Sequence, residues 1–166
     1  QINERIVLEK ISPSKDVEGL SPLNVYSWVK DLPSFIPPTA LGVIALLKYY
    51  NITLEGKHVV VIGRSMIVGK PVSFLLLREN ATITLCHSRS NPLSEYTQQA
   101  DILVSATGIP HIIESEMVKE GVVVIDVGVA MKDGKLTGDV HFDEVKQKAT
   151  YISPVPGGSG PVTVSM

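Results

Sequence analysis

Stretches that are apolar throughout alternate along this chain with stretches whose apolar residues recur at helical spacing. The segments HVVVIG (58–63), ILVSATG (102–108) and VVVIDVG (122–128) are rich in β-branched residues and end in glycine, which predicts buried β-strands. Strands that are apolar on both faces and separated by helices indicate a parallel sheet covered by helices on both sides. The pattern therefore predicts a doubly wound, Rossmann-like α/β fold.

The remaining segments extend this alternation over most of the chain. Asn3 is expected to cap a short helix over 3–11, and Thr39 a longer helix in which Val43 and Leu47 share one face. Further helices are expected over 68–80, 92–100 and 143–149, further strands over 82–86, 150–155 and the strand-like end 161–166, and a tight turn at 133–134 between two extended pieces.

Composition excludes several classes of function without changing the predicted fold. The 166 residues are 44% hydrophobic and 19% charged with a net charge of -2, which is ordinary for a globular protein. No run of five or more like charges occurs, so a nucleic-acid partner is not expected. No apolar stretch is long enough to span a bilayer, so a membrane partner is not expected either, and a cytoplasmic location is expected. The single cysteine, Cys86, is expected to be an inert core residue. The four histidines show no metal-ligand spacing, so no metal site is expected; His87 is interpreted as a surface residue.

The segment VVVIGRSMIVGKP (59–71) carries the strongest candidate chemistry. Gly63 would permit a sharp turn after the strand, and Gly69 would let the following helix approach it closely. Arg64 and Ser65 add a cation and a hydroxyl where a pyrophosphate would bind at the helix start. The standard G-x-G-x-x-G spacing is absent, so the two glycines could equally serve only the packing of the turn.

The residues that follow the second strand favour NADP over NAD. An NAD enzyme usually has a carboxylate there to accept a hydrogen bond from the ribose 2′-hydroxyl. This chain has HSRS at 87–90 instead, and Ser88 and Arg89 are donors suited to a 2′-phosphate. The alternative is a solvated loop with no ligand.

Two further turns follow strands that would end at the same edge of the sheet. Ligands of open α/β sheets lie outside the carboxyl ends of the strands. Thr107 and Gly108 after one strand, and Gly128 and Val129 after the next, would then line the nicotinamide side of a cofactor cleft, although each pair could be only a tight turn. Asp126 is interpreted as a cap of the turn that follows it.

Together these segments resemble the methylenetetrahydrofolate dehydrogenase/methenyltetrahydrofolate cyclohydrolase family. The resemblance covers essentially the whole chain and rests on motifs in the family's order. They are KDVEGLSPLN, FIPPTALGV, VVVIGRSMIVGKP, NATITLCHSRS, ADILVSATG, VVVIDVGV, GDVHFDEV and ISPVPGGSGPVT.

The resemblance implies an NADP-dependent enzyme that oxidises 5,10-methylenetetrahydrofolate to the methenyl form and hydrolyses it to 10-formyltetrahydrofolate. It implies one-carbon metabolism serving purine and amino-acid biosynthesis, and a homodimer. Residues 1–38 would be the tail of an N-terminal folate domain and a hinge, 39–156 the NADP-binding domain, and 157–166 a segment returning to the substrate cleft. Gly63, Arg64, Ser65, Ser88 and Val129 would contact the cofactor, and the folate would be bound by Asp16, Glu18, Pro156, Gly157 and Gly158.

The chain also departs from the family's pattern. The catalytic Y-x-x-x-K helix and the Gln-Leu-Pro segment would lie upstream of Gln1, so no catalytic residue is assigned here and a piece of a longer protein is expected. YSWVK (26–30) has the same spacing at the wrong place and is interpreted as a coincidence. Glu18 replaces an aspartate, and Ser159 a valine.

Without the upstream lysine no proton-transfer group for opening the methenyl ring is identifiable, so this portion is expected to bind cofactor with little turnover. Two alternatives stay open at this point. One is a dehydrogenase of similar fold acting on another small metabolite, such as a shikimate or amino-acid dehydrogenase. The other is a non-catalytic NADP-binding module.

Overall fold

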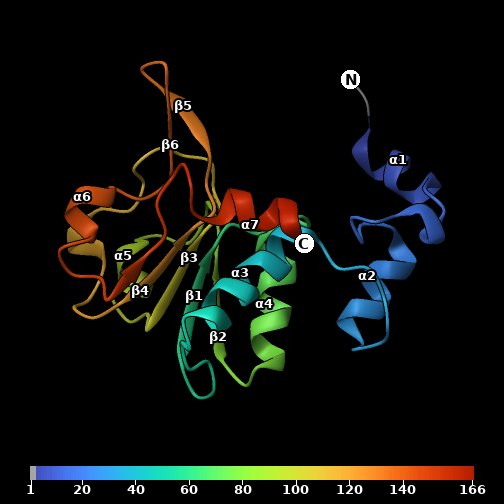
Figure 1. Ribbon diagram of the computed structural model, residues 1–166, viewed down its shortest axis with the longest axis horizontal. Helices are drawn as coiled ribbons and strands as arrows, with labels where there is room; N and C mark the ends of the chain where they lie inside the picture. The colour runs from blue at the N-terminus through green and yellow to red at the C-terminus, as the bar shows by residue number, and fades with distance from the viewer. Residues whose placement is uncertain (1–2) are drawn as a thin grey trace.

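The computed structural model describes residues 3–166, with the backbone alone at residues 4 and 5, as a parallel sheet between helices (Figure 1). The strands are β1 (His58–Ile62), β2 (Thr82–Cys86), β3 (Ile102–Ser105), β4 (Val123–Asp126), β5 (Ala130–Lys132), β6 (Lys135–Thr137) and β7 (Tyr151–Ile152). The helices are α1 (Glu4–Lys10), α2 (Pro22–Val29), α3 (Pro38–Tyr49), α4 (Gly69–Arg78), α5 (Ser94–Thr97), α6 (Phe142–Val145) and α7 (Ser159–Ser165), with 3₁₀ turns η1 (Pro13–Lys15) and η2 (Ser115–Met117).

The main sheet has five strands in the order β2-β1-β3-β4-β7, and every neighbouring pair is parallel. The chain moves from β1 outward to β2 and then crosses back to β3 on the other side of β1. The strand order therefore reverses between β1 and β3, which is the switch point of a doubly wound fold. The predicted fold class is confirmed.

Alternate residues of each central strand enter two separate cores. Val59 and Val61 of β1 face the core formed with α3 and α4, whereas Val60 and Ile62 face the core formed with the segments around α5, η2 and α6. Both sets are almost fully buried, which explains why β1 is apolar at every position after His58.

The elements at the sheet margin are shorter than predicted. Strand β7 pairs with β4 only at Tyr151 and Ile152, and α5 and α6 are single turns. The tight turn is confirmed: Asp133 and Gly134 join β5 to β6, and both have positive φ, as a two-residue hairpin turn requires.

Two local predictions were wrong. Thr39 does not cap α3, because that helix begins at Pro38 with Pro37 as its N-cap, and proline is well suited to a first helical position. In the strand-like end 161–166, residues 161–165 belong to α7 instead. A proline in the first turn is compatible with a helix, and α7 packs on α3, where a Cβ on Gly42 would meet Thr163 and Val162 at 3.5 Å.

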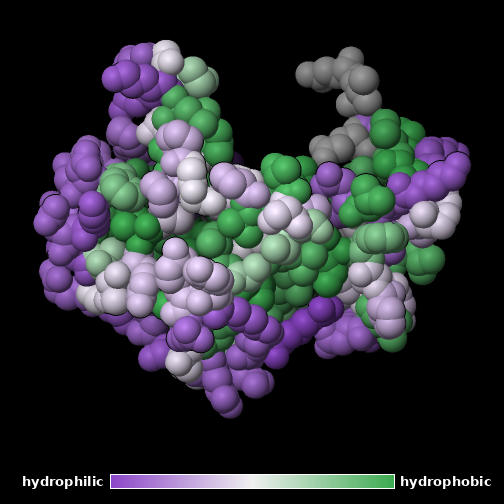
Figure 2. Space-filling view, in the orientation of Figure 1, coloured by the Kyte–Doolittle hydropathy of each residue, from purple (hydrophilic) through white to green (hydrophobic). Residues whose placement is uncertain are grey.

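The N-terminal segment lies beside the sheet domain and packs on it through α2 (Figure 1). Asn3 caps α1 as predicted, its side chain accepting from the Ile6 amide. Trp28 is buried and packs edge-on against Phe74 of α4, with 5.6 Å between ring centres. Arg78 of α4 pairs with Asp31 and donates to the carbonyl of Trp28. In Figure 2, hydrophobic residues gather over α7, α3 and α4, and hydrophilic residues surround α6. None of the helices in the described range is long and apolar enough to cross a membrane.

Candidate functional site

A hollow of about 600 Å³ lies at the carboxyl ends of β1, β2 and β3, at the switch point of the sheet. Its lining comes from the segments that follow these three strands. This is the place where an open α/β sheet binds its ligand, and the volume lies in the range of small-molecule sites.

The turn after β1 is closed by two glycines, as predicted. Gly63 has φ +109°, and a Cβ at this residue would overlap the carbonyl oxygen of Ala106. A Cβ on Gly69 would overlap the carbonyl oxygen of Gly63, so the start of α4 rests directly on the turn. The two glycines therefore allow close backbone contacts that keep the turn tight at the edge of the hollow, where a pyrophosphate at a helix start would bind.

Arg64 and Ser65 project from this turn and line the hollow. The Ser65 hydroxyl accepts from the Val68 amide at 3.1 Å and keeps its own hydrogen to donate. In the described part of the chain the Arg64 guanidinium makes no ion pair or hydrogen bond with the protein. Its charge is therefore available to an anionic ligand.

The segment after β2 forms an ordered turn at the edge of the same hollow. The His87 amide donates to the Ser90 hydroxyl, and Nδ1 of His87 accepts from the Arg89 amide, both at 3.1 Å. His87 is half-buried and lines the hollow, so it lies at the surface of the candidate site. An imidazole that accepts at Nδ1 stabilises the turn that presents Ser88. Ser88 and Arg89 are exposed, and no carboxylate stands among residues 87–90.

The structure brings together five of the eight predicted cofactor residues around the hollow. They are Gly63, Arg64, Ser65, Ser88 and Thr107. Arg89 is adjacent to it in the chain, whereas Gly108 and Val129 lie outside its lining. Val129 is 54% exposed. A Cβ on Gly108 would lie 4.0 Å from the carbonyl oxygen of Val129, so the turns after β3 and β4 are neighbours.

Sequence reasoning missed the apolar wall of the hollow. It is formed by Ile62, Leu93, Ala106, Ile109, Ile112 and Met117. Their position along the chain could have indicated them, because most of these residues belong to the segments that follow β2 and β3. Leu93, the member of this wall that belongs to the same segment as Ser88, offers an apolar surface to a purine base.

Two buried aspartates lie directly behind the turns after β3 and β4. Asp126 was predicted to cap the turn after its strand, and its Oδ1 indeed accepts from the Gly128 amide at 3.0 Å. The second aspartate, Asp139, was not predicted as a functional residue. Both are almost completely buried. Burial raises the pKa of Asp126 to about 6, with the nearby charge of Asp139 acting in the same direction and hydrogen bonds from the amides of Val140, Asp139 and Gly128 opposing it.

The predicted folate residues lie in two separate segments. Although burial opposes ionisation, hydrogen bonds from Asn24, Ser21 and Leu20 hold the pKa of Asp16 down to about 2. That carboxylate therefore fixes the loop that carries Glu18, which is exposed. Gly157, with φ +99°, and Gly158 line a hollow of about 460 Å³ beside α7, whereas Pro156 does not. Folate binding by these residues stays a prediction.

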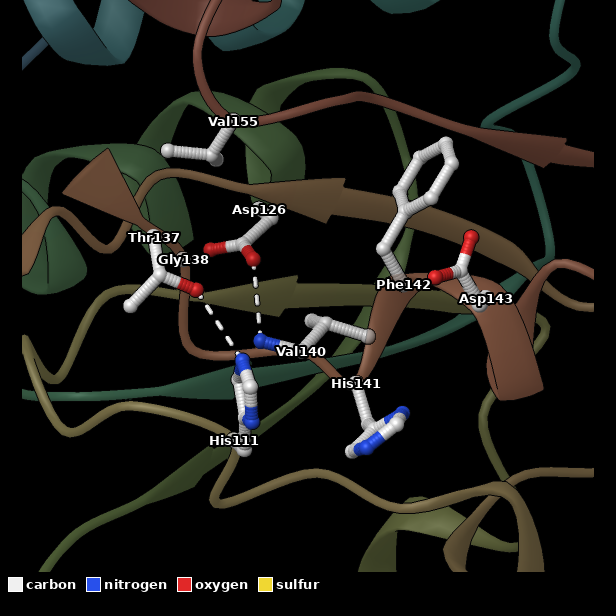
Figure 3. Close-up of a pocket in the computed structure, with 9 residues that line it drawn as sticks. All are labelled: His111, Asp126, Thr137, Gly138, Val140, His141, Phe142, Asp143 and Val155. Atoms are coloured by element: carbon white, nitrogen blue, oxygen red, sulfur yellow. Dashed lines mark hydrogen bonds between the residues drawn. The ribbon is translucent and has the colours of Figure 1, made fainter. Parts of the chain in front are cut away.

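A smaller hollow of about 190 Å³ contains two of the histidines (Figure 3). The rings of His111 and His141 lie 4.9 Å apart, and Nε2 of His111 is 3.0 Å from the Thr137 hydroxyl. Burial lowers the pKa of His111, with the charge of Lys132 adding to the effect. Over the described residues no group of three or more potential ligands is arranged to hold a metal ion. Cys86 is buried, and burial raises the pKa of its thiol.

YSWVK lies on α2, where Tyr26 is exposed and Lys30 follows the last helical residue. Both residues are far along the chain from the segments that line the cofactor hollow. The interpretation of this motif as a coincidence stays a prediction.

Comparison with known proteins identifies the family. Residues 37–166 match the model described as tetrahydrofolate dehydrogenase/cyclohydrolase, NAD(P)-binding domain. Bifunctional protein FolD of Bacillus subtilis is 55% identical over 166 residues, which are 99% of this chain and 59% of that protein. The bifunctional FolD enzyme of Campylobacter jejuni superposes with a TM-score of 0.95 at 49% identity, and FolD of Trypanosoma brucei, solved with NADP and an inhibitor, with 0.91 at 42%. Both superpositions cover 99% of this chain and 59% of the other. The chain thus spans about three fifths of its relatives' length, and it belongs to the tetrahydrofolate dehydrogenase/cyclohydrolase family.

Proposed function

We propose that this chain binds NADP in the hollow at the switch point. The observation that carries the proposal is the charge and donor pattern of the hollow: an Arg64 guanidinium without a partner among the described residues, an exposed hydroxyl at Ser88, and no carboxylate among residues 87–90. A carboxylate at that place would repel a 2′-phosphate, whereas a cation and hydroxyls attract it. The NADP in the Trypanosoma brucei relative supports the same assignment.

The residues fit this cofactor at three positions. The glycine turn at 63–69 would receive the pyrophosphate, because its close backbone contacts, which a Cβ on Gly63 or Gly69 would break, hold the start of α4 against the segment that lines the hollow. Arg64, Ser65, Ser88 and Arg89 would hold the phosphates, and Leu93, the member of the apolar wall that follows β2, would pack against the adenine. Thr107, Gly108 and Val129 would extend the site toward the nicotinamide. When bound, this cofactor accepts a hydride.

We infer that the chain is the cofactor portion of an enzyme that oxidises 5,10-methylenetetrahydrofolate to 5,10-methenyltetrahydrofolate and hydrolyses the product to 10-formyltetrahydrofolate. Residues 1–38 would contribute the tail of the folate domain and a hinge, and 157–166 would return to the substrate cleft. Hydride transfer requires folate and nicotinamide within reacting distance, which takes both walls of that cleft. Turnover by these 166 residues alone is therefore expected to be low. A homodimer is the assembly we expect, and sedimentation equilibrium would test it.

Two substitutions test the phosphate assignment by calorimetry. Arg64→Ala removes the unpaired cation and should weaken NADP binding about tenfold, the worth of one charge-assisted hydrogen bond. Ser88→Asp places a carboxylate beside the 2′-phosphate and should weaken NADP binding more strongly than NAD binding.

Lys57→Ala is the matched control. It removes one positive charge next to the amino end of β1, at the opposite edge of the sheet, and should leave NADP affinity near that of the wild type. Unchanged affinity in both Arg64→Ala and Ser88→Asp would reject the phosphate assignment, as would an equal loss in Lys57→Ala.

A further inference from the structure

Asp126 and Asp139 hold each other's loops in a reciprocal arrangement. Gly128 follows Asp126, and Gly138 precedes Asp139. A Cβ on Gly128 would overlap the carboxylate of Asp139, and a Cβ on Gly138 would overlap the carboxylate of Asp126. Each acidic side chain thus occupies the space that a side chain on the other loop would need.

The hydrogen bonds of the pair end on the two turns next to the cofactor hollow. Oδ2 of Asp139 accepts from the Thr107 amide at 2.7 Å and from the Ser105 hydroxyl at 2.8 Å. Oδ1 of Asp126 accepts from the amides of Gly128 at 3.0 Å and Asp139 at 3.2 Å. The turn after β3 is therefore fixed by one carboxylate, and the turn after β4 by the other.

The segment before α6 links the two carboxylates. Oδ2 of Asp126 also accepts from the Val140 amide at 2.9 Å, and Figure 3 shows this bond across the smaller hollow. The carbonyl of Asp126 accepts from the buried hydroxyl of Ser159 at 3.0 Å, which ties the PGGSGP segment to the same point. The family departure at Ser159 thus adds a hydrogen bond here.

Burying this pair of carboxylates lowers the stability of the fold. Two carboxylates are buried close together, and Oδ1 of Asp139 has no hydrogen-bond partner within the described residues. An unpartnered buried oxygen and a buried like charge both oppose folding. What the charges supply is two strong acceptors that fix the backbone amides of Thr107 and Gly128 relative to each other.

We propose that Asp126 and Asp139 are positioning residues that hold the turns after β3 and β4 as one surface for the nicotinamide half of the dinucleotide. The proposal rests on the NADP site proposed above. The proposal divides the NADP site into an adenosine and phosphate part and a nicotinamide part. The segments after β1 and β2 hold the adenosine and phosphates without help from the pair, whereas the nicotinamide half needs it.

Binding of two ligands to the same chain tests this separation. Adenosine 2′,5′-bisphosphate presents the adenine end alone, and NADP presents both halves. Asp139→Ala removes the acceptor from Thr107 and Ser105 and should lower NADP affinity about tenfold, since two hydrogen bonds that fix the turn are lost. The affinity for the bisphosphate should stay near that of the wild type. Asp139→Asn keeps one acceptor oxygen in the same shape and should restore most of the NADP affinity.

The outcomes distinguish this inference from the proposed function. A wild-type chain that binds neither ligand contradicts the NADP site itself. A wild-type chain that binds both, with Asp139→Ala losing both equally or neither, overturns only the positioning role. So does a failure of Asp139→Asn to restore binding in a folded protein.

Hydrogen exchange of the wild-type chain gives a test that needs no variant to fold. NADP should slow exchange together at the amides of Thr107, Gly128 and Val140, whereas adenosine 2′,5′-bisphosphate should slow exchange only in the segments after β1 and β2. Protection of Thr107 without Gly128 and Val140 would show that the two turns are not held as one surface.

Discussion

Gly69→Ala is expected to abolish measurable NADP binding and to lower the free energy of unfolding by about 3 kcal/mol. The added Cβ would overlap the carbonyl oxygen of Gly63, which belongs to the backbone and cannot rotate away. Either α4 moves off the sheet or the turn after β1 opens, and both changes remove the phosphate cradle. Urea unfolding gives the stability, and calorimetry with NADP gives the binding.

Gly160→Ala is the matched control for this substitution. Gly160 lies in α7, a Cβ there would have no neighbour within 4 Å, and its φ is not positive. Alanine is favoured over glycine in a helix by about 1 kcal/mol, so this variant should be unchanged or slightly more stable. If Gly69→Ala behaved like Gly160→Ala, the close contact between α4 and the turn would be wrong.

The parts of this site that sequence could predict are those governed by short-range rules. The β1 turn follows from an apolar strand that ends at Gly63, because a turn this tight needs glycine wherever the backbone is approached closely. Donors after β2 indicate a 2′-phosphate because they stand where a carboxylate would otherwise bind ribose. Both inferences need only the order of elements along the chain.

The parts that sequence did not predict depend on contacts between distant segments. Asp139 reaches the Thr107 turn across 32 residues of chain, and no local pattern announces such a bond. The end of the chain forms α7 because it packs on α3, a contact that the alternation of apolar and polar residues does not encode. The bond from the Arg89 amide to the His87 ring likewise depends on a turn that only the fold defines.

Asp126→Asn is expected to flatten the dependence of stability on pH between about pH 4 and pH 6. The pKa of Asp126 is raised from an ordinary 3.8 to about 6, so within this range the folded chain binds a proton that the unfolded chain has released. The stabilising effect of that proton is complete at low pH and is lost as pH rises through 6. The full change is about 3 kcal/mol, from two pKa units. The difference in unfolding free energy between wild type and variant, measured in urea at several pH values, should change by this amount.

Other titratable groups lie near Asp126, across the smaller hollow and in the loop beside it. They are His111, His141, Asp143 and Asp139. They are present in both the wild type and the variant, so subtracting the two unfolding curves isolates Asp126 apart from its coupling to them. Parallel curves between pH 4 and pH 7 would mean that Asp126 does not titrate in this range.

Asp16 provides a control with the opposite sign. Its pKa is lowered to about 2, so its ionised form stabilises the fold above about pH 4, and that stabilisation is lost as pH falls toward 2. Asp16→Asn should therefore change the pH dependence only below about pH 4, by about 2 kcal/mol. The two windows do not overlap, because hydrogen bonds dominate around Asp16 whereas burial beside a second carboxylate dominates around Asp126. If Asp16→Asn and Asp126→Asn changed the unfolding free energy over the same pH range, the two effects would come from a shared change of the whole fold and not from the surroundings of each carboxylate.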